Sequence, residues 1–228
     1  MKDLHGRAIR DYYQNKPAPL LLHTSYGETE DMPVEVFFRE ENDLSVLENL
    51  ALIECSGSVL DIGAGAGAHA LMLQARDFDV TALENSPGCV EVMRQSGVKQ
   101  VVNQDFRHHR QKYDTLLVLM NGLGLAGKLS GVQQLLKTLK GLLNPNGQLL
   151  IDSSDISYLF EDDNIQPDMD YYGNIRYQYE YKGTKGDWFD WVYVDSETLQ
   201  QEAEKAGLDA EIMHQDENDQ YLARLIIK

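Results

Sequence analysis

The stretch from residue 57 to residue 152 alternates short apolar runs with segments of helical periodicity, and this alternation constrains the fold most. Strands that are each followed by a helix predict a parallel sheet, because a parallel pair needs a long crossover connection. We therefore expect a doubly wound sheet with helices on both faces. The predicted strands are residues 58–62, 78–83, 99–102, 114–120 and 148–152, and the predicted helices are 68–75, 86–95 and 131–143.

The alternation stops after residue 154, and a different pattern begins. Residues 175–181 alternate with period two, and residues 187–194 are rich in aromatic and β-branched side chains, which predicts an inserted β-hairpin. A helix over 195–206 and an antiparallel pair at 208–214 and 220–227 are expected to follow. The sequence thus predicts an α/β fold whose mainly parallel seven-stranded sheet closes with an antiparallel pair.

The predicted organisation is one structural unit with additions at two places. Residues 1–56 are expected to form an N-terminal arm and a helical cover, irregular at 15–31 and helical within 33–54. Residues 57–228 are expected to form a cofactor-binding domain, with an insertion at 155–194. Because ligands of open α/β sheets lie outside the carboxyl ends of the strands, this insertion should wall the ligand site.

Charge and cysteine usage exclude several classes of partner. The chain has 20 Lys and Arg against 37 Asp and Glu, a formal net charge of −17, which repels phosphates and anionic lipids. Neither nucleic acid nor a membrane is therefore expected as a partner. Cys55 and Cys89 lack the spacing of a zinc site or a disulfide framework, so no metal is expected. With no secretory signal pattern and no membrane-length apolar run, the expected location is cytoplasmic.

The loop between the first predicted strand and its helix reads Asp61-Ile62-Gly63-Ala64-Gly65-Ala66-Gly67. Glycines at 63 and 65 allow a sharp turn and a close approach of a ligand to the backbone, beside the amide groups of the following helix. The spacing Gly63-x-Gly65-x-x-Ala68 also fits the dinucleotide fingerprint in its Ala-ended form. The glycines alone therefore leave NAD and other adenosine-bearing cofactors open.

The ends of three neighbouring predicted strands narrow the choice of cofactor. Asp61 suits a cationic group and would be unfavourable beside a pyrophosphate, whereas Glu84 can accept hydrogen bonds from both hydroxyls of a ribose. Asp105 and Phe106 follow the third strand and offer a carboxylate and an aromatic face, which suit an adenine ring. We expect these side chains to converge on one ligand.

This combination resembles the seven-stranded, class I, Rossmann-like S-adenosylmethionine-dependent methyltransferases, in particular small bacterial members whose substrates are unassigned. The resemblance implies S-adenosylmethionine as the cofactor, with Asp61 near its amino group and Glu84 on its ribose. It places Asn85 along the adenine, and Met120 and Asn121 beside the transferable methyl. The candidate cofactor-binding residues are then Asp61, Gly63, Ala64, Gly65, Gly67, Glu84, Asn85, Asp105, Phe106, Met120 and Asn121.

The expected activity is methyl transfer to a small-molecule acceptor. Asn121 is followed by Gly122 and not by the Pro-Pro-aromatic run of enzymes that methylate base amino groups, so the resemblance disfavours a nucleic acid substrate. An NAD-linked oxidoreductase and a non-catalytic module that binds S-adenosylmethionine stay open as alternatives. No general base is assigned, because several side chains are conceivable, namely Tyr12, Tyr13, His69, Asp152 and Tyr193.

The predicted hairpin carries a stripe of tyrosines on one face, at positions 177, 179 and 181. Such a stripe favours packing in the core or in a homodimer over a role as a substrate cage. A homodimer through this aromatic hairpin is therefore one expectation.

Overall fold

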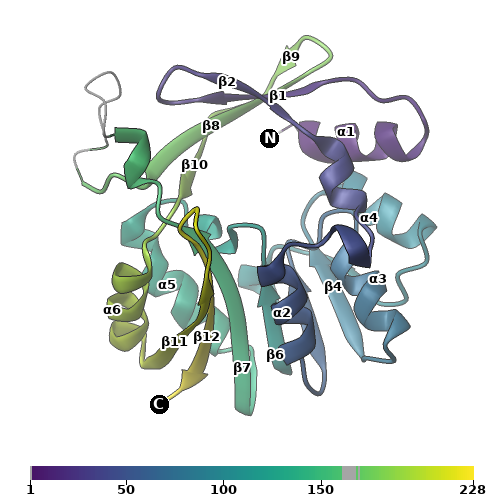
Figure 1. Ribbon diagram of the computed structural model, residues 1–228. Helices are drawn as coiled ribbons and strands as arrows, with labels where there is room; N and C mark the ends of the chain where they lie inside the picture. The colour runs from purple at the N-terminus through teal and green to yellow at the C-terminus, as the bar shows by residue number, and fades with distance from the viewer. Residues whose placement is uncertain (1, 161–167, 169) are drawn as a thin grey trace.

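The computed structural model describes residues 2–160, 168 and 170–228, and these form two sheets, a large one and a small one above it (Figure 1). The large sheet has seven strands in the order β11-β12-β7-β6-β3-β4-β5. The pairs β11–β12 and β12–β7 are antiparallel, and the other described pairs of this sheet are parallel. The predicted fold class is thereby confirmed. Its strands are β3 (Val59–Ile62), β4 (Val80–Glu84), β5 (Val101–Asn103), β6 (Tyr113–Val118), β7 (Leu143–Ser154), β11 (Leu208–Gln215) and β12 (Gln220–Ile227).

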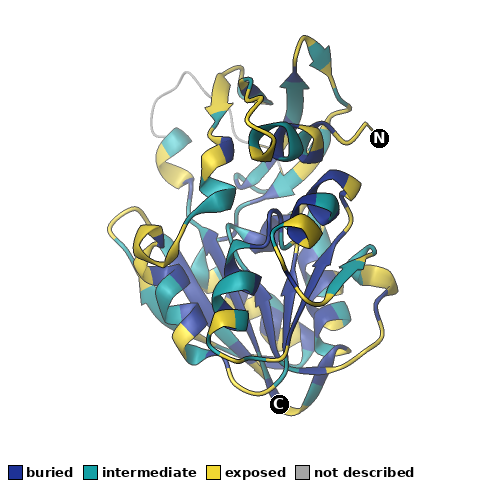
Figure 2. Ribbon diagram, turned by 90° about the vertical axis from the view of Figure 1, so that its right-hand side faces the viewer, coloured by how far each residue is buried: buried dark blue, intermediate teal, exposed yellow. Residues whose placement is uncertain are grey.

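Helices cover both faces of the large sheet, which explains why its central strands are mostly apolar. Every residue of β3 and of β4 is buried, as expected for strands between two helical layers. Figure 2 shows this buried sheet with exposed residues on the outer sides of its helices. One face packs on α2 (Val46–Glu54), α3 (Ala68–Ala75) and α4 (Pro87–Gln95), and the other on α5 (Leu129–Lys140) and α6 (Ser196–Ala206).

Local sequence signals set the helix ends near the site. Ser86 accepts a hydrogen bond from the Cys89 N–H at 3.2 Å, and Pro87 occupies the first position of α4. Asp195 accepts from the Thr198 N–H at 2.8 Å and begins α6, which ends where Gly207 has a φ of 76°. These helix boundaries were predicted from the sequence and are confirmed.

The small sheet joins the N-terminal segment to the insertion. Its order is β10-β8-β1-β2, with β9 paired to β8. β1 and β8 pair antiparallel, with Leu22 opposite Tyr179. The strands are β1 (Leu20–Thr24), β2 (Thr29–Met32), β8 (Asn174–Tyr181), β9 (Thr184–Lys185) and β10 (Phe189–Val192).

One prediction for the N-terminal segment is wrong, and another is confirmed only in part. Residues 15–31, expected to be irregular, contain β1 and β2, because β1 buries alternate side chains against a partner strand about 150 residues away. The helices expected within 33–54 are reduced to two short 3-10 turns, η1 (Val34–Phe38) and η2 (Glu41–Asp43), followed by α2. The α-helix starts only at Val46 because Ser45 and Glu48 form a capping box there.

The first helix, α1 (Leu4–Tyr13), packs across α4 at a close backbone crossing. A Cβ on Gly88 would lie 2.4 Å from the Gly6 carbonyl, so no larger residue fits at this crossing. Asp3 holds the same place, because its carboxylate accepts hydrogen bonds from the Ser86 hydroxyl at 2.9 Å and the Gly88 N–H at 3.0 Å. The N-terminal segment is thereby fixed to α4 and leads into the small sheet.

None of the helices in the described part of the chain is long and apolar enough to cross a membrane.

Candidate functional site

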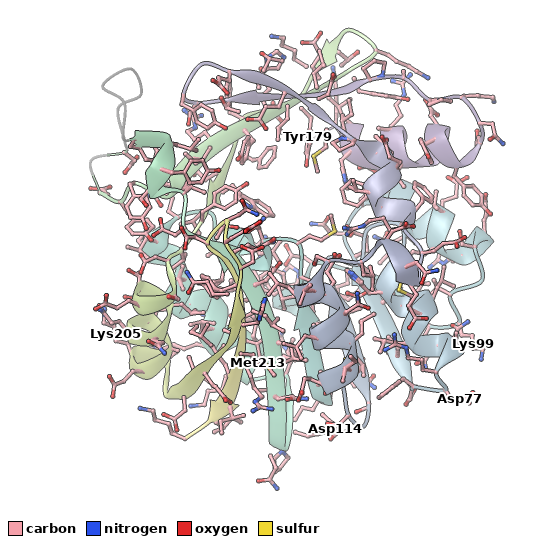
Figure 3. All side chains as sticks on the ribbon, in the orientation of Figure 1. Asp77, Lys99, Asp114, Tyr179, Lys205 and Met213 are labelled. Carbon is pink, nitrogen blue, oxygen red and sulfur yellow. The ribbon has the colours of Figure 1, made fainter. Side chains whose placement is uncertain are left out.

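A cavity of about 580 Å³ lies between the carboxyl ends of the central strands and the small sheet. Its floor is formed by the residues at and after the ends of β3, β4, β5, β6 and β7, and its roof by β1, β2, β8 and β10. Figure 3 shows Tyr179 below the small sheet, on the side that faces the large one. The cavity therefore occupies the place where α/β sheets of this kind bind ligands.

The glycine-rich loop forms one part of the floor. Gly63 and Gly65 have φ values of 74° and 55°, a region that side chains other than glycine rarely adopt, and both line the cavity with Ala64. Gly67 was predicted with them but is not among the lining residues. A Cβ there would lie 2.8 Å from Cγ of Met93, so this glycine allows close packing behind the loop.

Asp61 lies at the base of the cavity and is 2% exposed. Among the described residues its Oδ2 atom has no hydrogen-bond partner. Burial raises the pKa of this carboxyl, and the charge of His69 and the Ala70 N–H offset that effect only in part. A buried carboxylate oxygen without a partner fits a cationic group, such as the amino group of a methionine moiety.

Glu84 ends β4 and also lines the cavity. Its two carboxylate oxygens accept hydrogen bonds from the Gly65 N–H at 3.0 Å and the Ser86 N–H at 2.8 Å. Burial raises the pKa of this carboxyl, and the backbone N–H groups act in the opposite direction. These bonds fix the carboxylate beside the glycine-rich loop and Asn85, where a ribose could bind to it.

The residues after β5 are divided between the cavity and the surface. Phe106 lines the cavity, whereas Asp105 is not among the lining residues. The Asp105 carboxylate instead accepts from the Arg107 N–H at 2.9 Å and binds the Arg107 guanidinium at 2.6 Å. Gln104 lines the cavity in its place, a residue that our sequence analysis missed. Its position two residues after the end of the predicted strand 99–102 was the available signal.

The loop after β6 has a strained backbone. Met120 and Asn121 have φ values of 64° and 58°, although neither is glycine, and both line the cavity. The Gly122 N–H donates to Asp152 Oδ1 at 3.0 Å, and the Ser154 hydroxyl donates to Asn121 Oδ1 at 2.8 Å. Two residues of β7 thus hold this loop against the cavity.

A buried ionic group that the sequence analysis missed forms another wall. The Glu48 carboxylate accepts from Arg39 Nη1 at 3.1 Å, and its Oε1 lies 3.0 Å from His69 Nε2. Burial alone would lower the pKa of His69, but the bond to Glu48 and the charge of Asp61 raise it. Burial acts against ionised Glu48, yet its hydrogen bonds lower its pKa to about 2. The sequence offered His69 only as one of several conceivable bases and gave no sign of its partner Glu48, 21 residues earlier in the chain.

The roof is aromatic. Tyr177 and Tyr179 of the predicted stripe line the cavity, whereas Tyr181 is completely buried in the packing around α1. The stripe therefore serves both the core and the cavity wall. Of the side chains considered as a general base, His69, Asp152 and Tyr193 line the cavity, and Tyr12 and Tyr13 are not among its lining residues.

Comparison with known proteins assigns the family. Residues 37–211 match the model of a methyltransferase domain family. A SAM-dependent methyltransferase from Bacteroides fragilis, crystallised with S-adenosyl-L-homocysteine, is 40% identical, with a TM-score of 0.92 over 99% of this chain and 95% of that one. No curated protein sequence matches this chain.

More distant structures share the fold. The CcbJ methyltransferase from Streptomyces caelestis is 14% identical with a TM-score of 0.64, over 80% of this chain and 94% of that one. CalS10 from Micromonospora echinaspora, an amino pentose methyltransferase with SAM bound, is 14% identical with a TM-score of 0.54. The match covers 81% of this chain and 92% of that one.

The family match and the 40% identical structure decide against the NAD-linked oxidoreductase that the glycine spacing had left open. The site agrees with this outcome, because Asp61 Oδ2 has no hydrogen-bond partner in the described part of the chain, and a carboxylate there would repel a pyrophosphate. This chain belongs to the seven-stranded, class I S-adenosylmethionine-dependent methyltransferases, and its cofactor is S-adenosylmethionine.

Proposed function

We propose that the protein transfers the methyl group of S-adenosylmethionine to a small-molecule acceptor. The observation that carries this proposal is the roof of the cavity, because the small sheet covers the floor where the cofactor would bind. The cavity volume of about 580 Å³ lies within the range of roughly 300–1,000 Å³ found for small-molecule sites. A folded macromolecule would first have to displace the small sheet.

The same proposal assigns the cofactor residues. Asp61 would bind the amino group, and the backbone of Gly63, Ala64 and Gly65 would contact the methionine part. Glu84 would accept from the ribose, with Asn85 beside it, and Phe106 would pack on the adenine with Gln104 at its edge. Met120 and Asn121 would lie near the methyl group. Gly67 and Asp105 would act indirectly, through packing and through the turn η3 (Phe106–His108).

The cofactor when bound supplies an electrophilic methyl on a sulfonium, which is already a good leaving group. The residues of this chain therefore have to orient the acceptor, exclude water and accept a proton where the acceptor carries one. The roof of β1, β2, β8 and β10 would exclude water. Asp152 and Tyr193 line the cavity at places from which a proton could be accepted, whereas His69 is already held in the ionic group with Glu48.

Labelled S-adenosylmethionine and a fractionated cell extract test this function. We expect the purified protein to place labelled methyl in the small-molecule fraction and none in the protein or nucleic acid fractions. Label in a macromolecular fraction would contradict the small-molecule acceptor. Binding of the cofactor with no label in any fraction would favour the non-catalytic module.

The cytoplasmic location and the homodimer through the aromatic hairpin stay predictions.

A further inference from the structure

Five aromatic side chains form the part of the cavity wall that faces the strand ends. Tyr177 and Tyr179 come from β8, Phe189 and Trp191 from β10, and Tyr193 from the residue after it. The Phe189 ring centroid lies 5.2 Å from that of Tyr179 and 6.5 Å from that of Trp191, and the hydroxyls of Tyr177 and Tyr193 are 3.0 Å apart. Because the faces of aromatic rings are electronegative, such a wall attracts organic cations.

The cationic side chains of the cavity are already engaged or uncharged. Among the lining residues that the structure describes, the only Lys, Arg or His side chains are His5, Arg39 and His69. Arg39 and His69 both bind Glu48. Burial lowers the pKa of His5 to about 4, against the charge of Asp3, so its ring is neutral at neutral pH. None of these groups is therefore free to balance a further carboxylate.

Among the lining residues that the structure describes, two carboxylates are assigned neither to the cofactor nor to the Glu48 group. Glu30, on β2, accepts a hydrogen bond from the Tyr26 hydroxyl at 2.7 Å. Asp152, on β7, is 2% exposed, and its Oδ1 accepts from the Gly122 N–H at 3.0 Å. Burial raises the pKa of Asp152 to about 6, and the backbone N–H groups of the β6 loop act in the opposite direction. A buried carboxylate that lines a cavity is stabilised by a cation.

We propose that the methyl acceptor is a small cationic amine whose ammonium group binds between the aromatic wall and the Asp152 carboxylate. This inference rests on the proposed function, since it names the class of its small-molecule acceptor. An acidic acceptor would be repelled by Asp152 and Glu30, and a neutral hydroxyl could donate to a carboxylate but would not gain the attraction of the aromatic rings for a cation. Of these three classes of acceptor, only a cationic amine is attracted both by the aromatic wall and by the carboxylates.

In transfer to an amine, this site accounts for the proton that is lost, the bond that forms and the bond that breaks. The ammonium first loses one proton, which the Asp152 carboxylate accepts, because only a free lone pair can attack carbon. The nitrogen then forms a bond to the methyl carbon, while the electron pair of the carbon–sulfur bond passes to sulfur. The product is a methylated ammonium, and the proton leaves Asp152 to solvent.

A pair of matched probes tests the binding site without turnover. Choline carries a quaternary ammonium, and 3,3-dimethylbutan-1-ol has the same shape without the charge. We expect the complex with S-adenosylhomocysteine to bind choline at least about tenfold more tightly by calorimetry, a difference of ~1.4 kcal/mol. Equal affinities, or no binding of choline, would overturn the amine inference.

Two pairs of variants locate the effect. Asp152→Asn and Phe189→Leu should each lower choline affinity at least about threefold and leave the uncharged probe unchanged. Asp190→Asn and Trp188→Leu are the matched controls, because Asp190 pairs with Arg176 at 3.6 Å and Trp188 packs on the same guanidinium. Losses of the same size in the controls would show that the cation binds elsewhere. Circular dichroism verifies that each variant is folded.

A turnover panel separates this inference from the proposed function. It contains primary amines together with the matched alcohols and carboxylic acids, all tested with labelled S-adenosylmethionine. Transfer to amines and not to their matched partners supports the inference. Transfer to alcohols or acids alone overturns the amine and keeps the small-molecule acceptor. Label found only in macromolecules overturns both, and if no panel member is labelled, the choline comparison decides.

Discussion

Replacing Asp61 by Asn separates the stability of the protein from its affinity for the cofactor. Asp61 is 2% exposed, and one of its carboxylate oxygens has no partner among the described residues. In the free protein this charge is unfavourable, because burial raises the pKa of the carboxyl above that of the unfolded chain. An amide of the same shape removes the charge, and His69 keeps its bond to Glu48. We expect Asp61→Asn to stabilise the free protein and to weaken cofactor binding.

The two effects can be estimated from the structure. A buried unpartnered charge costs more than a buried unpartnered amide, and we expect a gain of about 1–2 kcal/mol in unfolding free energy at neutral pH. For a chain of this size that raises the Tm by about 2–4 °C for each kcal/mol. Loss of a charge-assisted hydrogen bond to the amino group costs about 1.5–3 kcal/mol of binding free energy, or roughly 10- to 150-fold in Kd.

The pH dependence has a definite sign. Since the folded pKa of Asp61 is raised, the contribution of this one carboxyl to stability is fully present below the unfolded value of about 3.9 and is lost as the pH rises. The difference in Tm between Asp61→Asn and the wild type should therefore vanish below about pH 4 and grow toward neutral pH. Thermal unfolding between pH 3.5 and 8, with calorimetric titration of S-adenosylhomocysteine, measures both effects.

Asp114→Asn is the matched control for this experiment. Figure 3 shows Asp114 at the opposite end of the sheet from the small sheet, and its carboxylate accepts from both the N–H and the hydroxyl of Ser58 at 2.8 Å. This variant should lose stability at neutral pH and keep its cofactor affinity. The reasoning would be refuted if Asp61→Asn lowered the Tm of the free protein at neutral pH while its cofactor affinity stayed at the wild-type value.

Three further predictions follow from the surrounding structure. Glu84→Gln keeps the shape of the side chain and should weaken cofactor binding by about 1–3 kcal/mol in calorimetry, and an unchanged Kd would exclude the ribose role. Gly88→Ala places a Cβ 2.4 Å from the Gly6 backbone and should speed proteolytic cleavage before residue 15, whereas a wild-type cleavage rate would show that the crossing can relax. Burial raises the pKa of the Cys55 thiol to about 12 and also raises that of Cys89, so both should react with a thiol reagent only after unfolding, and fast reaction of the folded protein would contradict their burial.

The sequence was sufficient for the large sheet because its signals are local. The apolar run before Gly63 and the glycines at 63 and 65 are adjacent in the chain, so strand, turn and helix could be assigned from a few residues. Ser86 and Pro87 marked the start of α4 in the same way. A parallel topology also brings the ends of neighbouring strands together, and Asp61, Glu84 and Phe106 do line one cavity.

Orientation within a loop was not predictable from such signals. Asp105 and Gln104 are adjacent, and the sequence favoured the carboxylate, yet Asp105 turns to its own Arg107 and Gln104 lines the cavity. Which of the two side chains enters the cavity depends on the ion pair between Asp105 and Arg107, which holds the Asp105 carboxylate away from the cavity. His69 illustrates the same limit, since its role follows from Glu48 at 3.0 Å, 21 residues earlier in the chain.

By itself, the sequence determined the seven-stranded fold, the family and the floor of the site, because each depends on short apolar runs, turn residues and caps that act over a few positions. Only the tertiary structure decided what covers that floor. β1 is a strand because it pairs with β8, which lies about 150 residues later in the chain. The local sequence of neither strand indicates which strand it pairs with. The aromatic roof and the acceptor chemistry inferred from it therefore depend on a long-range strand pairing.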